Sequence, residues 1–340
     1  MPWSGCRARA DLPVLHRQGP AASSGWLCST MQYFVTRKVT MQTLSAFDSR
    51  LADVAGVSVA NSTEIHGGDG AGLPMLVVEN ALGRAELTLQ GAHLTSFVPA
   101  GGHDLLWLSP KATFVPGKAV RGGIPLCLPW FGGHPEGKPA HGFARNHTWT
   151  LVGAEALADG TTRVTLELLP SDATRALWPD DFVARLAVTV GGSLTLALRF
   201  EHRGDHEVPF SSAFHTYFAV PDVAQADIEG LDGCTFINTV GGANTRQPQQ
   251  GTLRLDGPTD RVYLDVPAVQ AIRTAQGTTR IESDTRSAVV WNPAEFALNI
   301  ADVGDAYRHF VCVERGDVFD DARPLAAGGV YEKWLTLSLA

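Results

Sequence analysis

One histidine and one glutamate stand in apolar surroundings where they could act as an acid–base pair. His215 lies within the aromatic run FHTYF, and Glu314 ends the apolar run FVCVE. Histidine is the side chain best able to donate a proton near neutral pH, and apolar surroundings raise the pKa of a carboxyl group towards that of a useful base. Each residue alone also fits an ordinary role, as a core histidine bonded to a carbonyl or a solvated strand end.

Two arginines lie in glycine-containing segments that could present them to an anion. Arg121 precedes two glycines in VRGGIP, and Arg145 follows His141 by four positions in HGFAR. Positions four apart in an extended chain share a face, so His141 and Arg145 could line one pocket, and the two arginines could clamp a phosphate. A solvated surface turn explains VRGGIP equally well. Asp260, in TDRVY, is a weaker polar candidate that could simply cap a turn.

Motifs for several other chemistries are missing from the sequence. It contains no G-x-x-x-x-G-K-[ST] phosphate loop, no H-E-x-x-H zinc motif and no G-x-S-x-G nucleophile elbow. The segments EIH (64–66) and HRGDH (202–206) hold possible metal ligands, but not as a tight H-x-H arrangement on a strand. We therefore expect no metal and no cofactor.

The elements that must position these residues are short strands. Alternating or apolar runs bounded by glycine, proline and asparagine predict strands at 73–79, 85–90, 163–169, 183–190, 193–201, 226–229, 261–266, 288–291, 309–313 and 333–339. The runs 183–190 and 193–201 flank Gly191-Gly192 and predict a hairpin with one buried face. The best helix candidate is Asp172 to Trp178, capped by Ser171 or Asp172 and stopped by Pro179. Many strands with few helices indicate an all-β sandwich or barrel.

Composition limits the possible partners and the cellular location. The 340 residues carry 27 basic and 35 acidic side chains, a net charge of −8, which disfavours binding to nucleic acid or anionic membrane. The five scattered cysteines form no C-x-x-C pair, and no run of 18 apolar residues could span a membrane. We therefore expect a cytoplasmic protein, taken as a monomer, with a small-molecule ligand.

Residues 1–44 do not follow this strand pattern. They are basic, which loosely resembles a transit peptide, but they contain Pro2, Pro13 and Pro20 and show no amphipathic helical pattern. We expect a disordered extension or an over-extended start, with Met41 as an alternative beginning. One β-domain then covers 45–340.

Six segments, in this order, resemble the glucose-6-phosphate 1-epimerase branch of the aldose-1-epimerase superfamily. They are RGGIP, PWFG, HGFAR, FHTYF, WNP (291–293) and CVE (312–314). The resemblance runs from about Leu73 to Leu339 and includes LQGAH (89–93) and LLWLSP (105–110). Each motif alone is weakly specific, whereas six in register are strongly so.

This resemblance implies a large β-supersandwich that interconverts the α and β forms of a hexose 6-phosphate. It implies that His215 is the acid that protonates the ring oxygen and Glu314 the base that takes the C1 hydroxyl proton. It implies as substrate-binding residues His141 near the ring oxygen, Arg121 and Arg145 at the phosphate, and Asp260 at the sugar hydroxyls. The open aldehyde then rotates about C1–C2 and closes on its other face. We expect the cleft to raise both catalytic pKa values towards neutrality.

The chain departs from the family pattern directly after the expected base. Arg315 stands where the family usually has proline, and we expect it to loosen the turn or to lower the pKa of Glu314. Two other functions remain open at this point. One is an epimerase for unphosphorylated aldoses, and the other is a non-catalytic sugar-phosphate-binding protein on the same scaffold.

Overall fold

Antiparallel strands dominate residues 54–340, the part of the chain that this computed structural model describes. The first sheet has four strands in the order β1 (Val57–Asn61), β2 (Pro74–Asn80), β3 (Gly83–Thr88) and β4 (His93–Pro99). The second has the order β12 (Asp227–Glu229), β16 (Val269–Thr274), β17 (Gly277–Ser283), β20 (Val330–Leu339), β9 (Ser193–His202), β8 (Phe182–Val190), β7 (Thr162–Leu168) and β6 (Thr150–Ala156).

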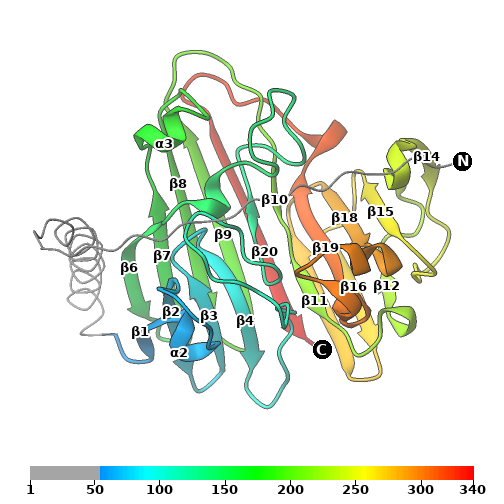
Figure 1. The fold of residues 1–340 in the computed structure, drawn as a ribbon, viewed down its shortest axis with the longest axis horizontal. Coiled ribbons are helices and arrows are strands. Elements are labelled where there is room, and N and C mark those ends of the chain that lie inside the picture. The colour runs from blue at the N-terminus through cyan, green and yellow to red at the C-terminus, as the bar shows by residue number, and fades with distance from the viewer. Residues whose placement is uncertain (1–53) are drawn as a thin grey trace, which may run out of the picture. The chain divides into compact units, whose positions relative to one another are not determined.

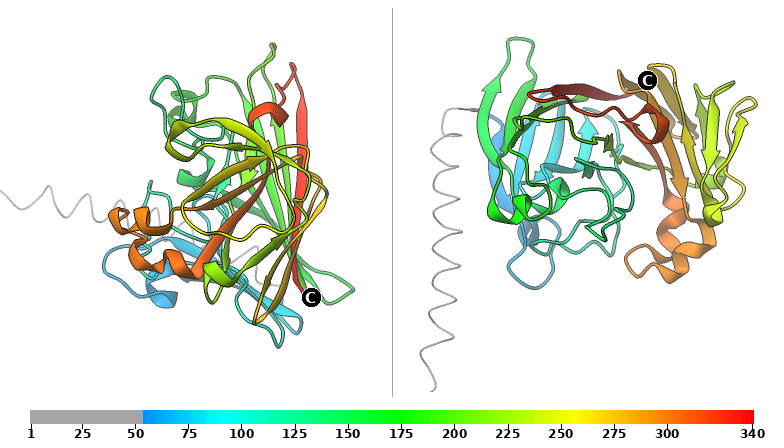
Figure 2. Two further views of the ribbon diagram at one scale, coloured as in Figure 1. Left: turned by 90° about the vertical axis from the view of Figure 1, so that its right-hand side faces the viewer. Right: turned by 90° about the horizontal axis from the view of Figure 1, so that it is seen from above.

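A third sheet carries the two candidate carboxylates, Asp260 and Glu314, and His215 lies between two of its strands. Its order is β14 (Thr245–Pro248), β13 (Thr235–Asn238), β15 (Thr259–Tyr263), β18 (Ser287–Asn292), β19 (Phe310–Asp317), β10 (Ser212–Phe214) and β5 (Leu126–Cys127), with β11 (Tyr217–Ala219) also paired to β19. In Figure 1 this sheet lies on the right, and the four-stranded sheet lies in front of the β7 to β9 part of the long sheet. Figure 2 shows these layers from above.

The helices among the described residues are all short. They are α2 (Ser62–Ile65), α3 (Asp172–Arg175) and the 3-10 turns η1 (Ala144–Asn146), η2 (Val223–Gln225), η3 (Val240–Gly242), η4 (Ala294–Asn299), η5 (Gly304–His309) and η6 (Phe319–Asp321). Ser171 caps α3, as its sequence suggests, but the helix ends at Arg175 rather than Trp178. No helix within residues 54–340 is long and apolar enough to cross a membrane.

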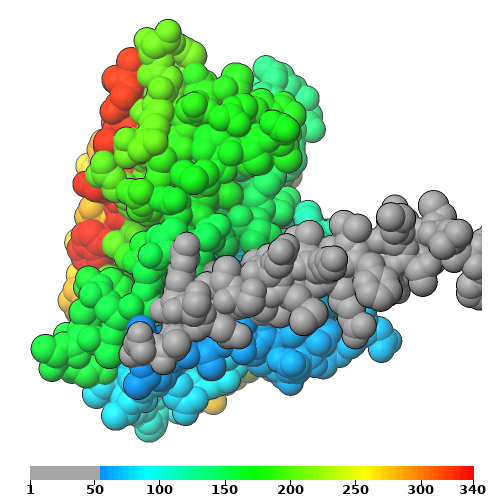
Figure 3. Space-filling view, turned by 90° about the vertical axis from the view of Figure 1, so that its left-hand side faces the viewer, coloured from blue at the N-terminus to red at the C-terminus, as the bar shows by residue number. Residues whose placement is uncertain are grey.

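The alternating apolar pattern accounts for the core. In the predicted hairpin β8–β9, Leu186 pairs with Leu198 and Val188 with Leu196, and all four side chains are buried. Residues that alternate with these, such as Arg185 and Ala197, face outwards, because successive side chains of a strand point to opposite faces. The hairpin belongs to the eight-stranded sheet that ends in β8, β7 and β6. Figure 3 shows the outer surface at this end, which lies above the four-stranded sheet in that view. The all-β prediction is confirmed, whereas the expected extension, 1–44, lies outside the described residues.

Candidate active site

Five of the six predicted site residues line one cavity of about 490 Å³. They are Arg121, His141, His215, Asp260 and Glu314. Aromatic side chains complete the wall, among them Tyr217 and Trp291. The cavity therefore combines polar groups that can hydrogen-bond a sugar with aromatic rings on which a sugar can lie.

Strand register places the carboxyl groups of this site on one face of the third sheet. On β19, Cys312 and Glu314 face the cavity side, while the alternate residues Val311 and Val313 enter the core. Glu314 is not at a strand end, as its sequence suggested, because β19 continues to Asp317. It is consequently only 2% exposed.

His215 lies beside Glu314 because β10 and β11 both pair with β19 in one register. Phe214 stands opposite Arg315 and Tyr217 opposite Cys312, so the two residues between them face Val313 and Glu314. The backbone N–H of His215 donates to the carbonyl of Pro125 at 3.0 Å, which continues the register of β10 with β5. The His215 Nε2 atom lies 3.3 Å from Glu314 Oε1, and the His215 ring stacks on Tyr217.

Burial moves the pKa values of this pair in opposite directions. It raises the pKa of Glu314 well above its usual range, with the Asp260 charge adding to the effect and Arg145 opposing it. It lowers the pKa of His215 well below its usual range, and the charges of His141 and Arg145 lower it further. The expectation that the cleft raises both values is wrong for His215, because a desolvated imidazole loses its proton more easily.

Two hydrogen bonds hold the guanidinium of Arg121 at the cavity wall. Its Nε donates to Asp302 Oδ2 at 3.2 Å and its Nη1 donates to the Tyr217 hydroxyl at 3.0 Å. The side chain is still 30% exposed. Asp302 belongs to the segment between η4 and η5, and sequence reasoning missed it because no motif surrounds it.

The segment that joins His141 to Arg145 is a tight turn rather than an extended strand. His141 has a φ of 63°, in the left-handed region, and its N–H donates to the Gly132 carbonyl at 2.7 Å. Arg145 lies in η1 and donates from Nη2 to the carbonyl of Ala140, so it does not line the cavity. Burial, with the charges of Arg145 and Arg121, lowers the pKa of His141 to about 4.

Asp260 lies on β15, two strands away from Glu314. It pairs in register with Trp291 on β18, which in turn stands opposite Cys312 on β19. Burial raises the pKa of its carboxyl group, and Thr239 opposes that shift by hydrogen bonding. Asp260 and Trp291 thus form one side of the cavity, suited to sugar hydroxyls and to the sugar face.

Arg315 points away from this site. It is fully buried on the opposite face of β19, where it donates to the carbonyls of Thr285 at 2.5 Å and Pro267 at 3.2 Å and to the Gln270 side chain. It is not among the groups that shift the pKa of Glu314, and β19 makes no turn there. Both expectations for Arg315 are therefore wrong, since alternation along the strand separates it from its neighbour.

The structure also shows which groups of the site could contact a metal. The ligand atoms of His215, Cys312 and Glu314 all lie within 4.8 Å of one another. Burial raises the pKa of the Cys312 thiol well above its usual range, so this thiol keeps its proton, whereas a metal needs the thiolate.

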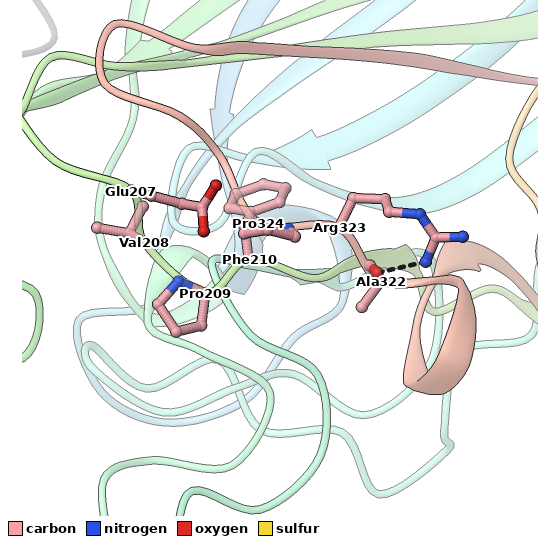
Figure 4. A pocket seen from close by; sticks show the side chains of 7 residues that line it. All are labelled: Glu207, Val208, Pro209, Phe210, Ala322, Arg323 and Pro324. Carbon is pink, nitrogen blue, oxygen red and sulfur yellow. Dashed lines mark hydrogen bonds between the residues drawn. The ribbon is translucent and has the colours of Figure 1, made fainter.

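A smaller cavity of about 270 Å³ shares no lining residue with the first (Figure 4). Its charged side chains are Glu207 and Arg323, and Arg323 donates to the carbonyl of Ala322. It contains no histidine and no pair of acids, so we place the chemistry in the larger cavity.

The chain belongs to the aldose 1-epimerase family, whose sequence model matches residues 74–338, and it is therefore an isomerase of sugar anomers. It is 39% identical over 249 residues to an Escherichia coli K12 protein named "putative glucose-6-phosphate 1-epimerase", covering 71% of this chain and 82% of that one. A protein of the same name from Cenchrus ciliaris is 35% identical over 243 residues, covering 68% and 74%.

A solved structure shares the same fold. The crystal structure of YeaD from Salmonella typhimurium, described as a "putative mutarotase", has a TM-score of 0.72 and 35% sequence identity. The match covers 79% of this chain and 90% of that one. The predicted family and the predicted β-supersandwich are both confirmed.

Proposed function

We propose that this chain interconverts the α and β anomers of a hexose 6-phosphate, with glucose 6-phosphate as the preferred substrate. The observation that carries the proposal is the His215–Glu314 pair, 3.3 Å apart, in the cavity that also displays Arg121. Relatives that carry the name of a glucose-6-phosphate 1-epimerase support the choice of substrate.

The pair supplies the two proton transfers that ring opening requires. Glu314 takes the proton of the C1 hydroxyl while His215 gives one to the ring oxygen, and the C1–O5 bond breaks. The aldehyde turns about C1–C2, and the reverse transfers close the ring in the other configuration. His141, which is neutral at pH 7 because its pKa is about 4, is available to hydrogen-bond near the ring oxygen.

Burial opposes ionisation of both groups, so it favours a single proton on the pair. With the pKa of Glu314 raised and that of His215 lowered, the empty site holds this proton on Glu314. Transfer from Oε1 to Nε2 gives the ionised base and the protonated acid without any exchange with solvent. A phosphate dianion in the cavity favours that transfer, because it stabilises the imidazolium.

We expect Arg121→Ala to raise KM for glucose 6-phosphate at least about tenfold, and to change KM for free glucose much less. Charge-assisted hydrogen bonds to a phosphate are each worth roughly 1.5–3 kcal/mol, and glucose has no such group. The measurement is steady-state anomerisation of both sugars, with Arg280→Ala, an exposed arginine of β17, as the control. Equal effects on the two sugars would favour an epimerase for unphosphorylated aldoses.

We expect kcat/KM to follow a bell-shaped pH profile, because this ratio reports the pKa values of the free enzyme. Activity falls on the acid side when the pair takes a second proton, through the lowered pKa of His215, below 6.5. It falls on the alkaline side when the pair loses its only proton, through the raised pKa of Glu314, above 4.5. Free glucose serves as a control substrate because the phosphate itself titrates near pH 6. An acid limb above pH 6.5 with glucose would contradict the burial argument.

We further propose that the protein acts as a cytoplasmic monomer on this small molecule. Cys127, Cys234 and Cys312 are all free thiols, as is usual in a reducing compartment.

A further inference from the structure

One aromatic side chain of the active-site cavity is left largely exposed. Phe319 begins η6, shortly after β19 ends at Asp317, and it lines the cavity. Figure 1 shows η6 as the orange-red turn beyond the end of β19. The side chain is 45% exposed, although phenylalanine is usually buried, and it belongs to none of the apolar clusters within residues 54–340. Its ring therefore contributes little to the packing of the fold.

The backbone of Phe319 adopts a conformation that phenylalanine rarely takes. Its φ is 52°, in the left-handed region, where glycine is unstrained and a bulky side chain is not. Six non-glycine residues of the described chain have such a φ, and the two of them that carry a ring, His141 and Phe319, both line the cavity. Backbone strain of this kind persists at functional sites, where the surrounding structure enforces it.

Hydrogen bonds on both sides of Phe319 enforce its conformation. Ser287 Oγ accepts from the N–H of Val318 at 3.3 Å and donates to Asp321 Oδ2 at 3.0 Å. The carbonyl of Phe319 accepts from the N–H of Ala322 at 3.1 Å. Val318 and Asp321 are both buried, so the residues before and after the ring are fixed to the sheet. The turn is therefore a rigid support that presents the ring to the cavity.

Strand register places Phe319 towards the end of the cavity remote from Arg121. Tyr217 accepts a hydrogen bond from Arg121 and stands opposite Cys312 on β19. Glu314 follows Cys312 on the same face of that strand, and Phe319 follows beyond its end. Along the direction of β19, Glu314 thus lies between the guanidinium of Arg121 and the ring of Phe319.

The cavity wall at this end is apolar. Val289 stands opposite Glu314, Val262 stands opposite Val289, and both valines line the cavity. Phe131 packs against the apolar cluster that contains these valines, and its ring centroid lies 6.4 Å from that of Phe319. Aromatic and aliphatic side chains of this kind suit the C–H groups of a sugar rather than its phosphate.

We propose that Phe319 contacts the substrate, with its ring packed on the C–H groups at the C1–C2 edge of the sugar. The proposal rests on the function proposed above, in which the phosphate lies at Arg121 and C1 at Glu314. In a pyranose, C2 lies across the ring from C5, which carries the phosphorylated C6, so the C1–C2 edge points away from the phosphate. Phe319 therefore contributes to binding of the sugar ring, whereas Arg121 binds the phosphate.

The test uses Phe319→Gly, which removes the ring and frees the backbone. KM from steady-state anomerisation and Kd from titration calorimetry are measured for glucose 6-phosphate and for free glucose. We expect both constants to rise at least about fivefold, by similar factors for the two sugars, with little change in kcat. Phe319→Tyr keeps an aromatic ring and should stay within about twofold of wild type. Phe296→Gly is the matched control, because Phe296 is 63% exposed on η4 and does not line the cavity.

The stability of the same variants gives a second readout. Phe319→Gly should unfold in urea at a midpoint no lower than that of wild type, because glycine adopts a left-handed φ without strain. Phe319→Ala also loses the ring but keeps a Cβ in the strained conformation, so its midpoint should lie below that of Phe319→Gly. A ring that served the fold would produce the opposite result, a clear loss of stability in Phe319→Gly.

An unchanged Kd for both sugars in Phe319→Gly, with a lowered unfolding midpoint, would overturn the proposal. So would a rise in Kd for glucose 6-phosphate but not for glucose, because the ring would then act on the phosphate. Wild-type protein that binds glucose 6-phosphate without anomerising it would contradict the function proposed above, and the contact would then be decided by Kd alone. If wild-type protein binds neither sugar, both proposals fail.

Discussion

Glu314→Gln is expected to lower kcat for anomerisation by roughly 10²–10⁴-fold, the usual contribution of a general acid or base. The amide has nearly the same shape as the carboxyl group but cannot exchange a proton with the sugar. The variant keeps a polar group 3.3 Å from His215, so the cavity is preserved. Exchange rates measured for this variant, with the exposed Glu332→Gln on β20 as the control, check the expectation. Activity within tenfold of wild type would remove Glu314 from the mechanism.

The same variant should not be less stable at alkaline pH. Burial raises the folded-state pKa of Glu314, so the folded chain keeps a proton that the unfolded chain releases above about pH 4.5. Its contribution to stability is therefore fully present below that pH and is lost as pH rises through the raised folded-state pKa. Gln does not titrate, so the free energy of unfolding of the variant, measured in urea at pH 8, should equal or exceed that of wild type.

Arg315→Ala is expected to lower the free energy of unfolding by about 4 kcal/mol, because it truncates a large buried side chain and removes hydrogen-bond donors from buried acceptors. The carbonyl of Thr285 and the side chain of Gln270 both accept from this guanidinium. Urea unfolding provides the measurement. Arg246→Ala, an exposed arginine paired with the exposed Asp320, should cost less than about 1 kcal/mol.

The activity of Arg315→Ala separates the two interpretations of this residue. If Arg315 acts only in the core, the folded fraction keeps a nearly wild-type kcat and an unchanged alkaline limb. A loss of stability below 1 kcal/mol, or an alkaline limb that moves, would show that its side chain influences Glu314 after all.

The sequence predicted those elements well whose formation depends on the local pattern of apolar and turn residues. The alternation in 183–190 and 193–201 specifies a buried face and a turn, and the structure has that hairpin with Val190 opposite Leu194. The helix at Asp172 was placed correctly at its cap, but its end depends on the packing of the following turns. Boundaries of elements depend on neighbours that the local sequence does not contain.

The site could be predicted only as separate segments. His215 and Glu314 are adjacent because β10, β11 and β19 share one register, and nothing in FHTYF or CVE specifies that register. Asp302 lies in a loop without a recognisable motif, so its contact with Arg121 appears only when distant segments are brought together. Arg315 was misread because its place in the chain, beside Glu314, suggested a contact that strand alternation forbids.

The most direct test of the central claim is magnetisation-exchange NMR at the anomeric protons of glucose 6-phosphate at equilibrium, with and without the protein. Free glucose and galactose are measured in the same way. We predict that exchange is faster for glucose 6-phosphate and little changed for the free sugars. Faster exchange for the free sugars alone would contradict the assignment to a sugar phosphate. No acceleration for any of the three would contradict catalysis by the His215–Glu314 pair.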